Sequence, residues 1–123
     1  MLLDNAAMVG FVPTKDATKA RAFYEGVLGF SVVSDNEWVM SLQSGEQRIM
    51  LQKNLKDEPL MRTIVGWEVR GIEDVVRNLT KAGVEFMRVQ WVEQNELGIW
   101  HSPDGKVAWF KDPDGNTLSV SEH

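Results

Sequence analysis

The same order of predicted elements occurs twice along this chain, and this repeat constrains the fold more than any other feature. In the first half, the residue pattern predicts a strand over 8–12 and then a helix, which begins at the N-cap Asp16 and ends at Gly29. Short apolar runs after the helix predict three more strands, over 30–33, 38–42 and 48–52. The first half therefore reads as a βαβββ module.

The second half repeats this order after a polar link over 53–59. A strand over 63–69 precedes a helix over 72–82, which ends at Gly83. The remaining strands are predicted over 84–91, 107–111 and 117–121. The chain is thus expected to be an α+β protein of one domain, 1–123, with module one over about 6–52 and module two over about 62–122. Because one helix covers only one face of a four-stranded sheet, the two tandem βαβββ modules are expected to form an open, curved sheet around a cleft.

A tight turn is predicted near the end of the chain, over 112–116. Pro113 fixes φ and Gly115 tolerates positive φ, which are the requirements of a short connection between two strands. The strand after the turn, 117–121, alternates apolar with hydroxyl side chains, so one of its faces is polar. Ser119 on that polar face is a candidate cleft residue.

Composition excludes several classes of function. The chain of 123 residues has no cysteine, so it has neither disulfides nor thiolate ligands, which fits a reducing compartment. Its net charge of −5 disfavours binding to nucleic acid and is compatible with a cationic ligand. No apolar run is long enough to cross a membrane and no signal segment starts the chain. A soluble, cytoplasmic protein is expected.

Two sequence motifs resemble a known family. The segment AFYEGVLGF over 22–30, following Asp16, and the DPDGN turn over 112–116 are similar to motifs of the vicinal oxygen chelate superfamily. This superfamily includes glyoxalase I, extradiol dioxygenases and bleomycin-resistance proteins. The resemblance covers nearly the whole chain and implies the duplicated βαβββ fold and a homodimer.

The resemblance also implies where a metal would bind in enzymes of the superfamily. Their ligands are histidine, glutamate or glutamine on the first and last strands of each module, and the matching positions here are Val9, Met50, Ile64 and Ser119. None of these side chains is a suitable ligand for Zn, Ni, Fe or Mn. Strand neighbours such as Glu122 face the other side of a sheet. We therefore expect no metal and no cofactor.

Few residues offer acid–base chemistry. His101 lies in a long predicted connection over 93–105, where it could act as a general base at the cleft or be an ordinary exposed residue. Asp112 and Asp114 belong to the predicted turn, so we interpret them as structural. No phosphate-binding glycine motif is present. The sequence assigns no catalytic residue.

Five tryptophans suggest an aromatic-lined pocket. Trp67 alternates with valines and is predicted to lie in the core, whereas indoles near the long connection could stack on a planar or cationic ligand. Strand alternation adds a sparse polar set on the predicted cleft side. The predicted ligand-binding residues are Phe11, Trp38, Met40, Arg48, Met50, Gln52, Ile64, Glu68, Trp91, Trp100, His101, Trp109 and Ser119.

These features favour a metal-independent function: binding or sequestration of a small organic molecule, either antibiotic-like or an aromatic metabolite. Two alternatives stay open. One is a metal-dependent lyase, isomerase or dioxygenase of the glyoxalase type. The other is an interaction or regulatory domain in which the cleft is closed.

Overall fold

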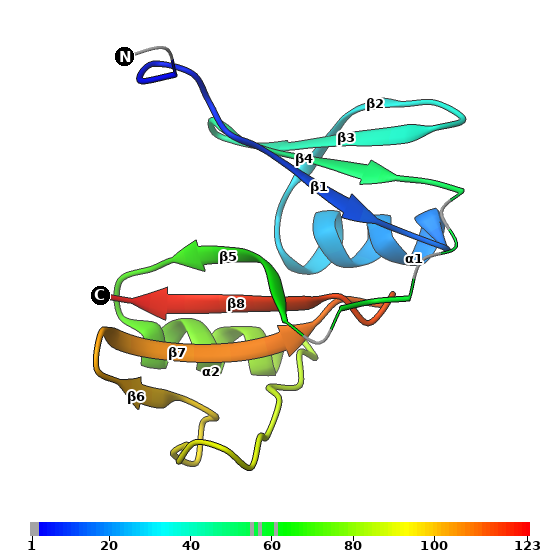
Figure 1. The fold of residues 1–123 in the computed structure, drawn as a ribbon. Coiled ribbons are helices and arrows are strands. Elements are labelled where there is room, and N and C mark those ends of the chain that lie inside the picture. The colour runs from blue at the N-terminus through cyan, green and yellow to red at the C-terminus, as the bar shows by residue number, and fades with distance from the viewer. Residues whose placement is uncertain (1–2, 55, 57, 61) are drawn as a thin grey trace. The chain divides into compact units, whose positions relative to one another are not determined.

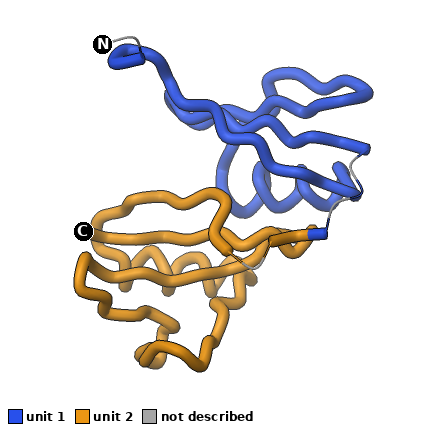
Figure 2. The backbone as a smooth tube through the Cα atoms, in the orientation of Figure 1, with its two compact units in different colours: residues 1–58 blue, residues 59–123 orange. Residues whose placement is uncertain are grey.

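The chain forms two compact units in a computed structural model that describes residues 3–54, 56, 58–60 and 62–123. Unit 1 spans 1–58 and unit 2 spans 59–123 (Figure 2). The division falls in the polar link that the sequence places between the two modules. Each unit contains one four-stranded sheet and one helical segment.

Unit 1 has the predicted βαβββ order (Figure 1). Its strand order is β1-β4-β3-β2, with β1 parallel to β4 and the other neighbours antiparallel. The helical segment consists of α1 and a π-helical continuation, η1. The elements are β1 (Val9–Pro13), α1 (Ala17–Arg21), η1 (Ala22–Val27), β2 (Ser31–Asp35), β3 (Val39–Ser44) and β4 (Gln47–Gln52).

Alternation along the strands separates the core of unit 1 from its open face. In β4, Ile49 and Leu51 are buried, and Leu51 is aligned with buried Val12 of β1. Asp16 caps the helix as predicted, because its carboxylate accepts a hydrogen bond of 3.2 Å from the Lys19 amide. One face of the sheet thus carries the buried apolar side chains, and the other carries the alternate residues.

Unit 2 repeats the same topology, with strand order β5-β8-β7-β6 (Figure 1). Again the first strand, β5, is parallel to the last, β8, and the other pairs are antiparallel. The elements are β5 (Thr63–Glu68), α2 (Ile72–Lys81), β6 (Trp100–Ser102), β7 (Gly105–Lys111) and β8 (Thr117–Glu122). The expected α+β class and two-module fold are confirmed.

Side chains from β7 and β8 that reach α2 identify the helix side of the second sheet. Glu122 accepts hydrogen bonds from the first amides of α2, and Lys106 contacts Glu73 on that helix. The alternate residues on the same side include Phe110, which is fully buried. Trp67 stacks on Phe110 with ring centroids 6.4 Å apart, so its predicted place in the core is confirmed.

The predicted strand over 84–91 is wrong. Only Phe86 forms a bridge, opposite Phe110, and the edge beside β7 is occupied instead by β6, in the segment predicted to be an irregular connection. The side chain of Gln94 takes the place of a partner strand: it accepts from the Val89 amide at 2.8 Å and donates to the Met87 carbonyl at 2.9 Å. These bonds satisfy the backbone without a ladder.

The predicted turn over 112–116 is confirmed. The Asp112 carboxylate accepts from the amides of Asp114 and Asn116 and from the Asn116 side-chain amide, at 2.9–3.0 Å. Gly115 has a φ of 87°, which suits glycine. The turn joins β7 to β8 and fixes their register.

In the described part of the chain, none of the helices combines the length and apolar character that a bilayer crossing requires.

Candidate functional site

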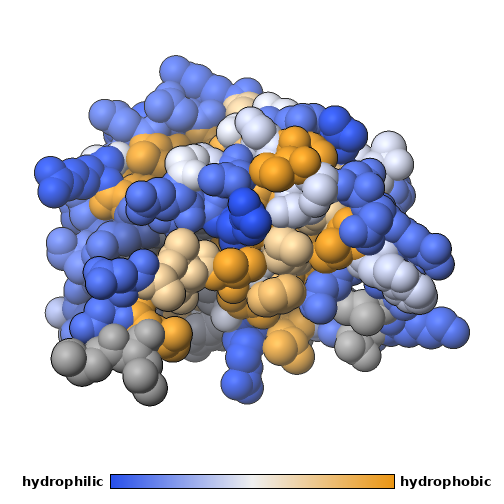
Figure 3. Space-filling view, turned by 90° about the horizontal axis from the view of Figure 1, so that it is seen from above, coloured by the Kyte–Doolittle hydropathy of each residue, from blue (hydrophilic) through white to orange (hydrophobic). Residues whose placement is uncertain are grey.

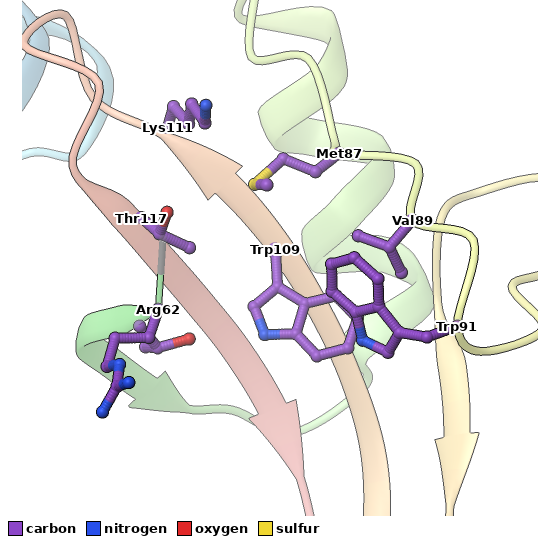
Figure 4. Close-up of a pocket in the computed structure, with 8 residues that line it drawn as sticks. Arg62, Met87, Val89, Trp91, Trp109, Lys111 and Thr117 are labelled. Atoms are coloured by element: carbon purple, nitrogen blue, oxygen red, sulfur yellow. The ribbon is translucent and has the colours of Figure 1, made fainter. Parts of the chain in front are cut away.

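A pocket of about 250 Å³ lies within unit 2, on the face of its sheet that α2 does not cover. We call it the tryptophan pocket. Side chains from three strands form its floor, and a segment before β6 supplies its wall (Figure 4). The lining residues are Arg62, Thr63, Met87, Val89, Trp91, Trp109, Lys111 and Thr117.

The floor of the pocket follows from the register of the strands. Lys111, Thr117 and Thr63 are paired in one row across β7, β8 and β5. Trp109 lies two residues before Lys111 on β7, so both side chains point to the same face. A polar row therefore lies beside an indole. Thr117 is buried and its hydroxyl is directed to the Leu60 carbonyl at 3.5 Å.

The wall of the pocket is the segment 86–91, which we call the wall segment. Its backbone starts beside β7, where the Met87 amide donates to the Trp109 carbonyl at 2.7 Å. The side-chain amide of Gln94 then bonds to Met87, Val89 and Gly98, and so holds the segment in place. Met87 and Val89 are half-buried, whereas Trp91 is 73% exposed. The wall segment thus presents apolar side chains to the pocket, and the accessible indole of Trp91 lies at its C-terminal end.

Trp109 is restrained by a second indole. Its ring stacks on Trp100 of β6, with centroids 6.0 Å apart and planes inclined by 24°. Such offset stacking restrains an indole beyond the effect of area burial alone. Because Trp109 is held in this way, it can present a fixed flat surface to the pocket.

Charge in the pocket is positive, in contrast to the chain as a whole. Lys111 and Arg62 line it, and the described lining includes no carboxylate. Neither cation forms an ion pair with a carboxylate of the residues that the structure describes. The arrangement offers aromatic stacking surfaces, apolar walls and two cationic groups, which are the features of a small-molecule site.

The groups with altered pKa lie on the helix side of the same sheet. Hydrogen bonds from the Gly71 and Ile72 amides lower the pKa of Glu122, and a hydrogen bond from Lys106 lowers the pKa of Glu73. The same hydrogen bond to Glu73 raises the pKa of Lys106. These groups stabilise the start of α2 and are not part of the tryptophan pocket.

Several predicted site residues lie in unit 1. Phe11, Met50, Arg48 and Gln52 share the open face of the first sheet, as alternation predicts, because Phe11 is aligned with Met50. Arg48 donates a hydrogen bond of 2.9 Å to Gln43 and lines an open hollow of about 610 Å³. Figure 3 shows hydrophobic side chains exposed among hydrophilic ones on the face seen from above.

Two other predicted residues of unit 1 do not join that face. Met40 points to the core side of the sheet and is only 3% exposed. It packs there because its neighbour across the ladder is buried Leu51. Trp38 precedes β3 and is 67% exposed.

Within unit 2, the structure brings some predicted residues together and separates others. Trp91 and Trp109 line the tryptophan pocket. Ser119 and Glu68 lie on the same open face, whereas Ile64 lies at an irregularity in the β5–β8 register. His101 is opposite Lys106, on the helix side, and with Trp100 borders a different hollow of about 560 Å³. It is therefore not placed to act on a molecule in the pocket.

Sequence reasoning missed six residues of the pocket: Arg62, Thr63, Met87, Val89, Lys111 and Thr117. Alternation from Trp109 could have found Lys111, and the hydroxyl face of the last strand could have found Thr117. Met87 and Val89 had no such signal, because their segment was predicted to be a regular strand.

The model of the Glyoxalase/Bleomycin resistance protein/Dioxygenase superfamily matches residues 5–120. The chain belongs to this superfamily. The resemblance drawn from the segments 22–30 and 112–116 is thereby confirmed. No curated protein sequence matches this superfamily member.

Solved structures share the fold at low sequence identity. A glyoxalase family protein from Enterococcus faecalis has a TM-score of 0.71 at 21% identity, with 99% of this chain and 100% of that chain covered. TnmS3, an antibiotic-binding protein from Streptomyces sp. CB03234, has a TM-score of 0.70 at 19% identity, covering 96% and 95%. Lactoylglutathione lyase from Agrobacterium tumefaciens has a TM-score of 0.72 at 15% identity, covering 96% and 93%.

The residues at the four positions where the resemblance places metal ligands lack the donor groups of such a site. Val9 and Met50 lie on strands of unit 1, and Ile64 and Ser119 lie on strands of unit 2; none carries an imidazole or a carboxylate. The nearby carboxylate of Glu122 is used by the amides of α2. Among the described residues, no three His, Cys, Asp or Glu side chains are grouped as a metal site requires.

Proposed function

We propose that this chain binds a small planar organic molecule, either antibiotic-like or an aromatic metabolite, in the tryptophan pocket without using a metal. One observation carries the proposal: two indoles and two apolar side chains from separate parts of unit 2 converge on one pocket, with only a few polar groups beside them. This is the composition of sites that enclose organic ligands.

The size of the pocket limits the ligand. A volume of about 250 Å³ is close to the lower end of the range for ligand pockets, about 300–1,000 Å³. One ring or two fused rings fit this space, and a larger molecule would extend from it into solvent. The ring system would stack on Trp109, which Trp100 holds in place.

Two further findings support binding rather than metal-dependent turnover. The residues at the positions where the resemblance places metal ligands have no imidazole or carboxylate, and one structural neighbour, TnmS3, is itself an antibiotic-binding protein. That neighbour is only 19% identical, so it supports a class of function and no particular ligand.

The test is isothermal titration calorimetry of metal-stripped protein with a library of mono- and bicyclic aromatic compounds. We expect micromolar to millimolar binding by some members, unchanged by added Zn, Ni, Mn or Fe(II). Trp91→Ala should weaken the best ligand about tenfold, because a stacked aromatic contact contributes about 0.5–1.5 kcal/mol beyond its area.

Trp38→Ala is the matched control, since Trp38 has a similar exposure and does not line the pocket. Equal losses in the two variants, or no binding across the library, would contradict the proposal. Binding or turnover only after metal is added would favour the alternative, a metal-dependent lyase, isomerase or dioxygenase.

The resemblance further predicts a homodimer in the cytoplasm. Sedimentation equilibrium of the purified protein tests the first point, with an expected mass twice that of one chain. A concentration-independent monomer would contradict it.

A further inference from the structure

We propose that the tryptophan pocket selects planar aromatic anions, with Lys111 binding the negative group. This inference rests on the proposed function, because it names the class of ligand that the pocket would take. The observation behind it is the combination of two stacking surfaces with two cations and no acidic side chain in the described lining.

The geometry of β7 places the cation within reach of a stacked ring. Trp109 and Lys111 are separated by two residues on one strand, so their side chains emerge from the same face about 7 Å apart. The lysine stem is flexible, and its ammonium can approach a carboxylate attached directly to a ring on Trp109. Figure 4 shows Lys111 and Trp109 along the same strand, with Met87 beside them.

Among the described residues, no carboxylate forms an ion pair with Lys111 that would neutralise it. The carboxylate of its chain neighbour, Asp112, is bound by the amides of the turn. Lys106 provides a contrast, because Glu73 already binds its ammonium at 2.8 Å on the helix side.

The overall charge of −5 does not reverse this preference. Exposed charges farther than a Debye length, about 10 Å at 0.1 M salt, are largely screened. A cation at the edge of a half-enclosed pocket is close enough to act on the ligand directly. Arg62, which also lines the pocket, adds charge of the same sign.

Three matched probes test the inference by calorimetry: 2-naphthoate, neutral 2-naphthamide and cationic 2-naphthylmethylamine. We expect 2-naphthoate to bind about tenfold more tightly than 2-naphthamide at 0.05 M salt, and the cation to bind most weakly. The preference should decrease at 0.5 M salt, because the interaction is electrostatic and partly exposed.

Lys111→Met should reduce the preference for 2-naphthoate over 2-naphthamide to about twofold or less. Lys111→Arg should keep it. Lys81→Met is the control, since Lys81 is an exposed lysine on α2, on the other side of the sheet. Circular dichroism of each variant verifies that the fold is intact.

The possible failures are distinguishable. Equal affinity for 2-naphthoate and 2-naphthamide, or tighter binding of the cation, overturns the ligand class and leaves the proposed binding function in place. A preference for the anion that survives Lys111→Met overturns the role of Lys111. Absence of binding by all three probes and by the wider library overturns both proposals.

Discussion

The turn over 112–116 should stabilise unit 2 through a single buried carboxylate. Asp112 is 5% exposed and Asn116 is 2% exposed, and three donors converge on the Asp112 oxygens. Asp112→Ala removes both acceptor oxygens and so all three of these hydrogen bonds. Two of the donors, the backbone amide and the side-chain nitrogen of Asn116, then lose their buried hydrogen bonds to the carboxylate, at about 1–3 kcal/mol each. We expect the free energy of unfolding to fall by about 3 kcal/mol.

Asp112→Asn separates the contribution of the two backbone hydrogen bonds from that of the Asn116 side-chain bond. Its Oδ1 can still accept from the two backbone amides, but its Nδ2 faces the Asn116 Nδ2, so two donors oppose each other. The expected loss is about 1.5 kcal/mol. Exchanging the pair, in Asp112→Asn with Asn116→Asp, restores a donor and an acceptor, and stability should return to within about 0.5 kcal/mol of wild type.

Urea denaturation followed by tryptophan emission measures these differences. The same variants also test the connection to the pocket, because the turn joins Lys111 to Thr117. Affinity for 2-naphthoate should decrease in Asp112→Ala and recover in the exchanged pair. A loss below 1 kcal/mol in Asp112→Ala, or no recovery in the exchanged pair, would refute the reasoning.

Three further perturbations follow from the structure. Gly66→Ala places a Cβ 2.6 Å from the Ser119 Oγ, so urea denaturation should show a loss of about 1 kcal/mol that Ser119→Ala largely removes. Glu122→Gln should make the free energy of unfolding depend less on pH in the acid range. The lowered pKa of this carboxylate stabilises the fold above pH 4.5, its ordinary pKa, and this contribution is lost as the pH falls through the folded-state pKa. Gln94→Leu leaves the wall segment without its side-chain partner, so hydrogen exchange there should accelerate and unfolding should cost about 1–3 kcal/mol less.

Elements with a strong local signal were predictable from the sequence. The helix that Asp16 caps, the turn around Gly115 and the alternation in β4 each depend on residues close together in the chain. Two copies of the same order then specified the topology. Alternation also placed Phe11 and Met50 on the same side of the sheet, and the structure pairs these two residues across β1 and β4.

The ligand site was less predictable, for reasons that particular residues make clear. Met40 shares the alternation of Trp38 in the sequence, but that face packs into the core. His101 was expected in a loop near the pocket and instead lies in β6, where register directs it to the helix side. A shift of one residue in strand register moves a side chain to the other side of the sheet, and the sequence pattern alone does not specify that register.

The strand wrongly predicted over 84–91 and the pocket residues missed in the same segment have one cause. The segment 84–91 has the apolar residues of a strand, but its apolar pattern does not reveal the polar contacts that replace a ladder there. Gln94 supplies the hydrogen bonds that a ladder would have supplied, and β6 takes the neighbouring edge of β7. Because Met87 and Val89 do not belong to a regular strand, their side chains can line the pocket beside Trp109 instead of extending the sheet by one more strand. The departure from the repeat therefore creates the site, and module one, whose corresponding strand β2 pairs along β3, has no equivalent wall among its described residues.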